Sequence, residues 1–572
     1  MAKATRLPAS RSTTPKTTTF GVFAACDPRI DAASRERTVN IVAIIADIIA
    51  KNVQMPNGTP VEVVYAPLLV DTEKQADIVA RQFRRAGVDA VVCCPDTWAF
   101  PQLTVMSLLG HFPADMPVNF TVGNTAPKPG VVFAHAANGA LGQSGRLSHL
   151  NVGAWADTGM KPKPSAETVT ALTDWCYAAL TYAGLQGRRV VVFGHDSMGM
   201  ETAIPHIIPT RRTFGLEITR LDMKLLADML QKGSHDAREL KALRGWVDKH
   251  VGKRLDLSQP DGEEKFNQSL ALYLIVRDLM DELSAVGGGF MSQLEWGSDP
   301  RGEPLPIADA MESLLNSTFD HNGTKPASPF ATEADVQGLL TMLVTTWLSG
   351  GHPPLFMDFR KAWGPEELTS VAKRLKVRFN GKELWARRGI VDGNNSGSAS
   401  LNWAGKPGDP VAAIMKNVSM PGAELDYFPG GGNSVTFISP GGIEGIAGRL
   451  AYSDLSGMFS LTWDEATTVD LPEKLARAIA GSSNVTWPHT WVMPKYATMG
   501  EYKQYAPANH FHMVWDLSPA RLEYWMDLAN VLSVTPWQGR GEHIEGTDRS
   551  LPLLYLLNGG QDITKMRRAG KM

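Results

Sequence analysis

Apolar runs and helically spaced segments alternate through the first third of the chain. The apolar runs predict strands at 19–25, 61–67 and 88–94, and the predicted helices between them are 35–51 and 72–86. Strands that alternate with helices form parallel sheets that are covered by helices on both faces. In such sheets, ligands bind at the loops that follow the carboxyl ends of the strands. Those loops here contain Asp27, Arg29, Asp96 and Trp98.

A second unit of the same kind begins near residue 164. Its predicted strand is 188–193, and its predicted helices are 167–183, 219–231, 265–283 and 335–348. The charged segment 233–264 is expected to form a helical excursion on the surface.

The pattern changes after Pro353, where short apolar or alternating runs are separated by glycine, proline and asparagine. These runs are 354–358, 434–439, 449–455 and 458–462, and they predict a β-rich, barrel-like domain. The expected fold class is therefore α/β, with two N-terminal Rossmann-like α/β domains followed by a β-rich C-terminal domain. The expected divisions are a flexible tail over 1–19, α/β domains over 20–163 and 164–350, and the β-rich domain over 351–572.

The composition excludes several classes of protein. Of the 572 residues, 43% are hydrophobic and 20% are charged, which is typical of a globular protein. The 56 basic and 59 acidic side chains give a net charge of -3, which argues against a broad surface for nucleic acid or anionic lipid. No apolar stretch is long enough to predict a membrane span. The 4 cysteines lack CxxC spacing and fit reduced thiols in a cytoplasmic protein.

The turn after strand 188–193 approaches a hydrolase motif without matching it. A nucleophile elbow requires glycine two residues before its serine, whereas His195 occupies that position before Ser197. A serine hydrolase using Ser197 is the alternative that this turn leaves open. The triple glycines at 287–289 and 430–432 lack the spacing of nucleotide-binding loops, so no nucleotide is expected.

Two carboxylates are candidates for the chemistry. Glu333 precedes a mostly apolar helix, where the electrostatics of a helix start would also explain an acidic side chain. Asp358 follows a short apolar strand, where burial makes an unpaired charge costly. Asp358 therefore requires a partner, and Arg360, a backbone cap and a metal ion all remain open.

Two histidines add a further candidate. His510 and His512 stand two residues apart in a strand-like run, so both side chains can face the same side. Two carboxylates and one imidazole suit Mn²⁺, Mg²⁺ or Co²⁺, with positions left for substrate oxygens. A non-haem iron site using both histidines and Asp358 is an alternative. For His512 itself, a place beside the site or in the core is preferred.

Several short motifs, taken in order, resemble those of the L-fucose isomerase family. The three that carry the chemistry are Ala331-Thr332-Glu333-Ala334-Asp335, the segment from Phe356 through Asp358 and Arg360 to Trp363, and Ala508-Asn509-His510. Further matching segments are 197–199, 315–323, 395–399, 427–432, 487–491 and 544–548. The resemblance runs from about Phe20 to about Leu557.

This resemblance implies a metal-dependent aldose–ketose isomerase, which is an intramolecular oxidoreductase. It implies Glu333, Asp358 and His510 as ligands of Mn²⁺, with Mg²⁺ or Co²⁺ as alternatives, and the two carboxylates as the acid–base pair. A proton would move between C1 and C2 of the sugar through a cis-enediol, and a hydride shift stays open. The family is typically a homohexamer in which neighbouring subunits complete each site. Arg29 and Trp98 would contact the substrate there.

The resemblance also implies further substrate-binding residues and raises a question of specificity. These residues are Ser197, Met198, Gln293, Asn433, Trp487 and Asn509. Asn433 replaces a family tyrosine, and Met291 and the Leu294-Glu295 pair replace other polar family residues. A retained metal centre with altered sugar-facing positions favours the same reaction on a related substrate. The first expectation is a sugar of the L-fucose or D-arabinose type, and the alternative is a modified hexose such as sulfoquinovose.

Overall fold

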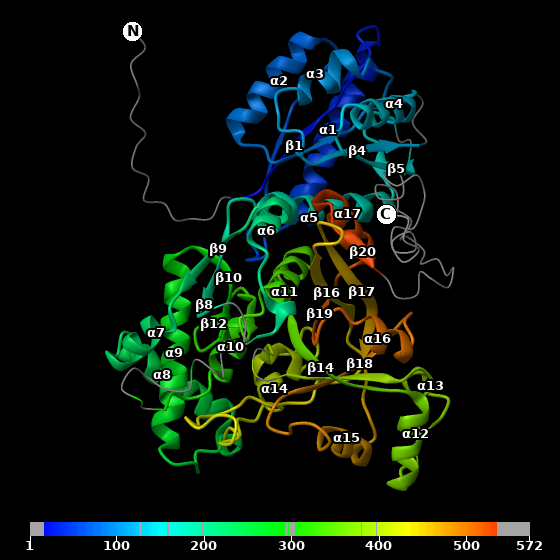
Figure 1. The fold of residues 1–572 in the computed structure, drawn as a ribbon. Coiled ribbons are helices and arrows are strands. Elements are labelled where there is room, and N and C mark those ends of the chain that lie inside the picture. Colours follow the sequence, from blue (N-terminus) through cyan, green and yellow to red (C-terminus); the bar gives the residue numbers. More distant parts are fainter. Residues whose placement is uncertain are drawn as a thin grey trace.

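The computed structural model describes residues 17–124, 128–156, 159–195, 199–291, 296, 302, 304–378, 380–395, 397 and 399–534. Most of the predicted tail at 1–19 lies outside the described residues, as do Ser197, Met198 and Gln293. Two parallel sheets and an antiparallel barrel follow one another along the chain (Figure 1). The predicted α/β fold class, with a barrel-like C-terminal region, is confirmed.

The first unit is a five-stranded parallel sheet in the order β2-β1-β3-β4-β5. Its strands are β1 (Thr19–Phe23), β2 (Glu62–Tyr65), β3 (Ala90–Cys93), β4 (Val118–Gly123) and β5 (His149–Gly153). One face packs against α1 (Ala32–Asn52) and α5 (Ala166–Leu185). The other face packs against α2 (Glu73–Ala86), α3 (Ser107–Leu109) and α4 (Gly130–Gln143). A short hairpin of β6 (Trp155–Ala156) and β7 (Lys163–Pro164) leads into α5.

Local sequence signals set the ends of these helices. The Asp31 carboxylate accepts from the Ser34 N–H at 2.7 Å and caps α1. Gly87 ends α2 in the left-handed conformation with φ 70°, as its position in the sequence predicts.

The second unit is a four-stranded parallel sheet in the order β13-β10-β8-β9. Its strands are β8 (Arg189–Phe193), β9 (Glu217–Leu221), β10 (Ala285–Phe290) and β13 (Phe330–Thr332), with a small hairpin of β11 (Phe319–Asp320) and β12 (Gly323–Thr324). Its helices are α6 (Ile207–Phe214), α7 (Met223–Gln231), α8 (Ala237–His250), α9 (Gly262–Glu282), α10 (Asp309–Asn316) and α11 (Val336–Leu348). The charged segment 233–264 does contain a helix, α8, with few buried residues.

One predicted helix begins in the wrong place. Residues 219–221 belong to β9, which pairs with β8, and α7 starts only at Met223. The Asp222 carboxylate accepts from the Lys224 N–H at 2.8 Å and caps α7, so the chain changes from strand to helix at this residue.

The C-terminal region is a closed barrel of antiparallel strands in the order β16-β19-β14-β15-β18-β17, which the pairing of β17 with β16 completes. The strands are β14 (Leu355–Trp363), β15 (Ile390–Asn394), β16 (Glu444–Ser453), β17 (Met458–Thr468), β18 (His489–Pro494) and β19 (His510–Trp515). A further strand, β20 (Leu532–Val534), runs parallel to β17. The helices are α12 (Pro365–Arg374), α13 (Leu384–Arg388), α14 (Val411–Met415), α15 (Glu473–Ala480), α16 (Met499–Tyr505) and α17 (Pro519–Ala529). The predicted strand at 434–439 is wrong, because that segment makes only isolated bridges.

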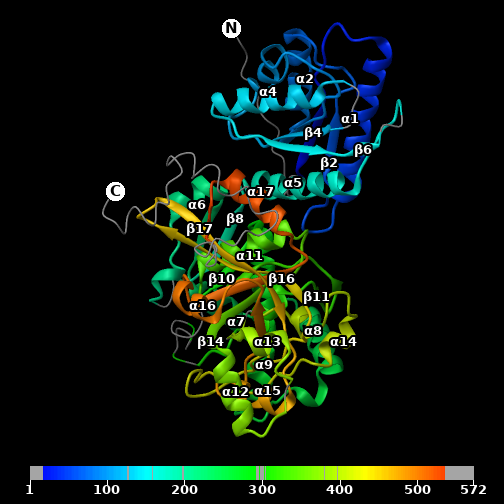
Figure 2. The same ribbon diagram turned by 90° about the vertical axis from the view of Figure 1, so that its right-hand side faces the viewer.

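Helix α11 joins the second sheet to the barrel. All of its residues are buried, and it contacts β10 and β13 on one side and β16 and β19 on the other (Figures 1 and 2). The Leu450 N–H of β16 donates to the Thr341 hydroxyl of α11 at 2.9 Å. Residues at the start of α11 are therefore held against the barrel strands.

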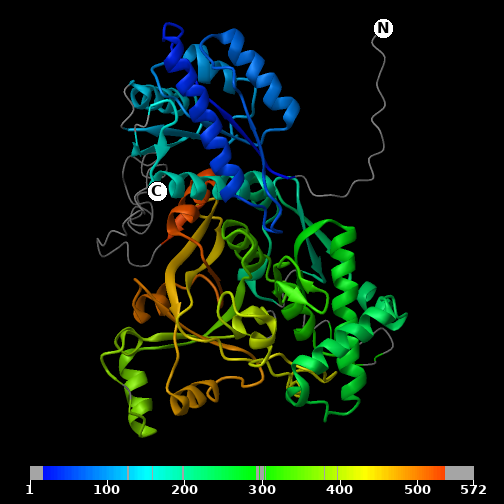
Figure 3. The ribbon, with the colours of Figure 1, turned by 180° about the vertical axis from the view of Figure 1, so that it is seen from behind.

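The first sheet stands apart from the barrel, with α5 and α17 packed between them (Figure 3). Arg521 of α17 binds Asp174 of α5 at 3.0 Å. The four cysteines are buried and unbridged, as expected for reduced thiols. Within the described residues, every helix is too short or too polar to cross a membrane.

Candidate active site

Glu333 lies in a strained turn between β13 and α11. Its φ of 60° and the φ of 50° at Ala334 are both in the left-handed region, which is unfavourable for residues with a side chain. The Ala334 N–H donates to the Phe290 carbonyl at 3.0 Å. The Asp335 carboxylate accepts from the Gly338 N–H at 2.9 Å and caps α11. Strained backbone of this kind concentrates at functional sites.

Asp358 and His510 lie directly opposite each other on β14 and β19. His510 Nε2 lies 3.3 Å from Asp358 Oδ1 and 3.4 Å from Glu333 Oε2, so one imidazole nitrogen faces both carboxylates. The His510 side chain is 3% exposed, whereas those of Glu333 and Asp358 are 12% and 17% exposed. The imidazole therefore lies at the closed end of the cluster, and the carboxylates lie toward solvent.

Asp335 binds the other ring nitrogen of His510. Its Oδ2 lies 2.7 Å from His510 Nδ1, and Arg449 pairs with both of its oxygens. Burial alone would raise the pKa of Asp335, but Arg449 and His510 outweigh burial and hold this pKa well below its usual range. Burial would likewise lower the pKa of His510, but the three surrounding carboxylates raise it well above its ordinary value.

The donor set of Glu333, Asp358 and His510 fits a divalent cation. Two carboxylates and an imidazole suit Mn²⁺, Mg²⁺ or Co²⁺, and a carboxylate on the second ring nitrogen is the usual support of a metal-binding histidine. Among the described residues, no group of three or more histidine, cysteine or acidic side chains is already arranged to hold a metal ion. In this structure the imidazole and the two carboxylates contact one another directly. A cation would take the place of these direct contacts.

Comparison with protein families identifies the first two units. Residues 17–187 match the model of the first N-terminal domain of L-fucose isomerase, and residues 188–350 match that of the second N-terminal domain. The chain belongs to the L-fucose isomerase family. Members of this family are aldose–ketose isomerases, so the enzyme class predicted from the motifs is confirmed, and it replaces the serine hydrolase hypothesis for Ser197.

Curated relatives extend this similarity into the barrel. The L-fucose isomerase of Streptococcus pneumoniae is 27% identical over 504 residues, which cover 82% of this chain and 83% of the relative. The L-fucose isomerase of Phocaeicola vulgatus is 27% identical over 506 residues, which cover 80% of this chain and 82% of the relative. The family models divide the chain at 187/188, after α5. The boundaries at 163/164 and 350/351 stay predictions.

Asn509 is the predicted substrate-binding residue that the structure brings to the cluster. Its Nδ2 lies 3.5 Å from Asp358 Oδ1 and 3.6 Å from Met200 Sδ. The loop that begins at residue 199 therefore lies beside Asp358. Its predicted neighbours Ser197 and Met198 are outside the described residues, as is Gln293.

Trp487 lies next to the only arginine of strand β14. This arginine, Arg360, is two residues after Asp358. Its guanidinium lies 5.4 Å from the centre of the Trp487 ring. Arg360 is thus not the ion-pair partner of Asp358, one of the three possibilities that the sequence left open. The Trp487 side chain is buried against Phe428. Its indole N–H finds no acceptor within the described residues.

Asn433 was predicted to bind the substrate, but its amide is buried and binds backbone carbonyls. It is 1% exposed, and its Nδ2 donates to the carbonyls of Asp256 at 2.6 Å and Met420 at 3.0 Å. The amide therefore holds two backbone segments together, and no contact joins it to the His510 cluster within the described residues.

Arg29 and Trp98 lie in the first unit, at the carboxyl edge of its sheet. Arg29 pairs with Asp27 at 2.6 Å, and this hydrogen bond lowers the pKa of Asp27 to about 2. The Arg29 guanidinium lies 5.7 Å from the Phe100 ring centre, and Trp98 contacts the same ring edge-on. The fold places these residues in a different unit from His510 (Figure 1).

Arg449 and His512 complete the surroundings of the cluster. The sequence predicted a place beside the site or in the core for His512, with an iron ligand as the alternative, and it predicted no role for Arg449. Arg449 Nη1 lies 3.2 Å from His512 Nε2. A lone arginine inside an apolar strand signals a buried acidic partner, because an unpaired buried charge is costly. That signal was available in the run at 449–455, although it does not say which acid is the partner.

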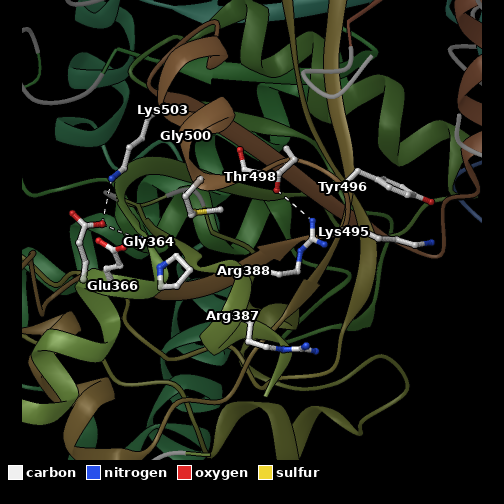
Figure 4. Close-up of a pocket in the computed structure, with 13 residues that line it drawn as sticks. Gly364, Glu366, Arg387, Arg388, Lys495, Tyr496, Thr498, Gly500 and Lys503 are labelled. Carbon is white, nitrogen blue, oxygen red and sulfur yellow. Dashed lines mark hydrogen bonds and ion pairs between the residues drawn. The ribbon is translucent and has the colours of Figure 1, made fainter. Parts of the chain in front are cut away.

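A pocket of about 830 Å³ lies elsewhere, between α12, α13 and the start of α16 (Figure 4). It is lined by residues including Glu366, Arg387, Arg388, Lys495 and Thr498. Two further lining residues, Lys503 and Glu367, form an ion pair at 3.2 Å. None of the predicted site residues lines this pocket, so it is separate from the candidate active site.

Proposed function

We propose that this chain interconverts an aldose and its 2-ketose with a divalent cation, in the first instance Mn²⁺, held by Glu333, Asp358 and His510. The observation that carries the proposal is the meeting of one imidazole nitrogen with two carboxylates at 3.3 and 3.4 Å, in a chain of the L-fucose isomerase family. When bound, the cation would act as a Lewis acid on two oxygens of the open-chain sugar.

The two carboxylates would carry the proton between C1 and C2. Removal of the C2 proton by one of them, with delivery of a proton to O1, would produce a cis-enediol. Return of a proton to C1, with loss of the O2 proton, would complete the ketose. Glu333 and Asp358 are partly exposed and so can reach a substrate. Asn509, 3.5 Å from Asp358 Oδ1, would orient that carboxylate. His510 is buried beneath both and would hold its position through Asp335.

A sugar panel tests the reaction and its substrate. The Mn²⁺-loaded protein would be incubated in D₂O with L-fucose, D-arabinose, D-altrose and sulfoquinovose, and ketose formation followed by NMR, with Glu333→Gln as the control. Turnover of one sugar that the variant lacks supports the proposal. Deuterium at C1 or C2 supports the enediol, and its absence supports a hydride shift. Failure of the wild-type protein to bind any divalent cation would contradict the mechanism.

A sugar of the L-fucose or D-arabinose type is the first substrate that we propose. Arg360 favours a second candidate, a hexose with an anionic substituent such as sulfoquinovose. Its guanidinium has no acidic partner among the described residues and stacks on Trp487, so it is free to bind an anionic group. Arg360→Met would then raise the KM for the sulfonated sugar at least about 10-fold while changing the KM for L-fucose much less. Equal changes would exclude this specific role.

We also propose a homohexamer, in the cytoplasm, whose neighbouring subunits complete each active site. Arg29 and Trp98 follow strands of the first sheet, whereas His510 lies in the barrel, and this separation supports the arrangement. Mixing two inactive variants tests it. Subunit exchange between Trp98→Ala and Glu333→Gln would restore part of the activity, since some sites would then combine two intact halves. No restoration after demonstrated exchange would place Trp98 outside the site.

A further inference from the structure

Asp335 binds three different parts of the molecule although it is fully buried. One oxygen accepts from the Gly338 N–H at the start of α11. Arg449 of β16 pairs with both oxygens, with Nη2 at 2.9 Å from Oδ1. His510 Nδ1 of β19 lies 2.7 Å from Oδ2. A buried carboxylate with all these partners holds each of them in one orientation.

A His510 ring that binds a cation through Nε2 must be neutral, and the contact with Asp335 decides where its remaining proton lies. An ionised carboxylate can only accept hydrogen bonds, so the proton is on Nδ1. The neutral ring then presents a lone pair at Nε2, the atom that faces Glu333 and Asp358. The opposite tautomer would direct an N–H toward a cation and could not bind it.

Arg449 extends this arrangement to the second histidine. A guanidinium can only donate, so His512 Nε2, at 3.2 Å from Arg449 Nη1, accepts. Since Nε2 of His512 already accepts from Arg449, His512 is a poor candidate for a metal ligand. This argues against the non-haem iron site, which requires both histidines as ligands.

Arg449 also binds the loop that approaches the site. Its Nη2 donates to the Thr202 carbonyl at 2.7 Å, and Gln337 of α11 donates to the Ile204 carbonyl at 3.0 Å. Met200, in the same loop, contacts Asn509. A single arginine therefore connects the support of His510 with the loop beside Asp358.

We propose that Asp335 and Arg449 are positioning residues that set the cation affinity of the site by fixing the tautomer and orientation of His510. This inference rests on the proposed function, because it assumes that His510 is a ligand. It goes beyond the ligand set by assigning the affinity of that set to a buried ion pair, Asp335 with Arg449, that does not contact the cation.

The test compares two variants that each replace a buried aspartate beside a histidine. Asp335→Asn removes the charge that fixes His510, and Asp392→Asn does the same to His489, whose ring contacts Asp392 at 3.0 Å. Mn²⁺ affinity would be measured by calorimetry on metal-free protein, and the visible spectrum of the Co²⁺-loaded protein would report the ligand geometry. Circular dichroism and gel filtration would confirm that each variant is folded.

We expect Asp335→Asn to weaken Mn²⁺ binding by about 10–100-fold and to alter the Co²⁺ spectrum, while Asp392→Asn leaves both unchanged. Affinity within about two-fold of the wild-type value in Asp335→Asn, or an equal loss in both variants, would overturn the positioning role. If Asp335→Asn does not fold, Arg449→Gln takes its place, and unchanged affinity there would also overturn it. Wild-type protein that binds Mn²⁺ and isomerises a sugar upholds the proposed function whichever result the variants give, whereas wild-type protein that binds no Mn²⁺ overturns both.

Discussion

Two barrel strands begin with a buried histidine whose Nδ1 meets a buried aspartate, and only one of the two lies in the candidate site. His489 starts β18 and lies 3.0 Å from Asp392. His510 starts β19 and lies 2.7 Å from Asp335. The two histidines therefore share the same position in a strand and the same kind of first hydrogen-bond partner.

The second ring nitrogen separates them. Nε2 of His489 meets the Asn484 carbonyl at 3.0 Å and the Asn394 amide at 3.2 Å, so its contacts are all neutral groups of the protein. Nε2 of His510 meets two partly exposed carboxylates. A buried aspartate–histidine pair is therefore not a site by itself, and what the free nitrogen faces decides whether the pair holds the fold together or binds a ligand.

The largest effect that we expect comes from replacing the two histidines in parallel. His510→Gln would lower kcat at least about 10²–10³-fold, because it removes a cation ligand between the two acid–base carboxylates. His489→Gln would leave kcat within a few-fold and lower the melting temperature instead. Steady-state kinetics and thermal unfolding of both variants measure this difference. Similar losses of kcat in the two would show that the pairs are not functionally distinct.

The effect of Mn²⁺ on thermal stability also distinguishes His510 from His489. A ligand that binds only the folded state at 1,000 times its Kd stabilises that state by about 4 kcal/mol. Mn²⁺ added to the metal-free protein should therefore raise the melting temperature of the wild type and of His489→Gln, but not of His510→Gln. A chelator should reverse the shift and abolish activity. An equal shift in His510→Gln would place the cation elsewhere.

The sequence predicted those parts of the molecule that repeat a simple period. Parallel strands with covering helices follow from apolar runs between helical segments, and the predicted Glu333, Asp358 and His510 do come together in the structure. Their motifs are separate in the sequence, so it was the order of motifs in the family, and not local periodicity, that joined them.

The support of the site was not predictable in the same way. Asp335 and Arg449 are 114 residues apart, and nothing local to either residue names the other. The left-handed backbone at Glu333 and Ala334 is equally hidden, because the usual signal for it, glycine, is absent. The start of the predicted helix at 219 failed because the five residues of β9 are too few to show a period.

Asp392→Asn should lower the stability of the protein without changing its catalysis, and this effect should be smaller than those of the histidine variants. Its carboxylate is buried, and its Oδ2 has no hydrogen-bond partner within the described residues. Loss of a charged partner for His489 should lower the free energy of unfolding by roughly 1–3 kcal/mol without changing KM or kcat. Urea unfolding and kinetics on the same preparation check this. A change in KM larger than the change in stability would indicate that His489 reaches the substrate.

A third buried aspartate, Asp464 of β17, provides the most specific test, because it changes only the pH dependence of stability. It accepts from the Ala497 N–H at 2.9 Å, and burial raises its pKa to about 7, whereas its charged neighbours lower the pKa of Asp335. Between about pH 4, where the unfolded chain ionises, and pH 7, the folded protein keeps a proton that the unfolded chain releases. Stability from Asp464 is thus complete at low pH and falls by about 1.4 kcal/mol per pH unit across this range. Asp464→Asn should lose this slope, so the difference in unfolding free energy between wild type and variant should change steadily from pH 5 to pH 7. A constant difference would mean that Asp464 is ionised in the folded protein, as Asp335 is.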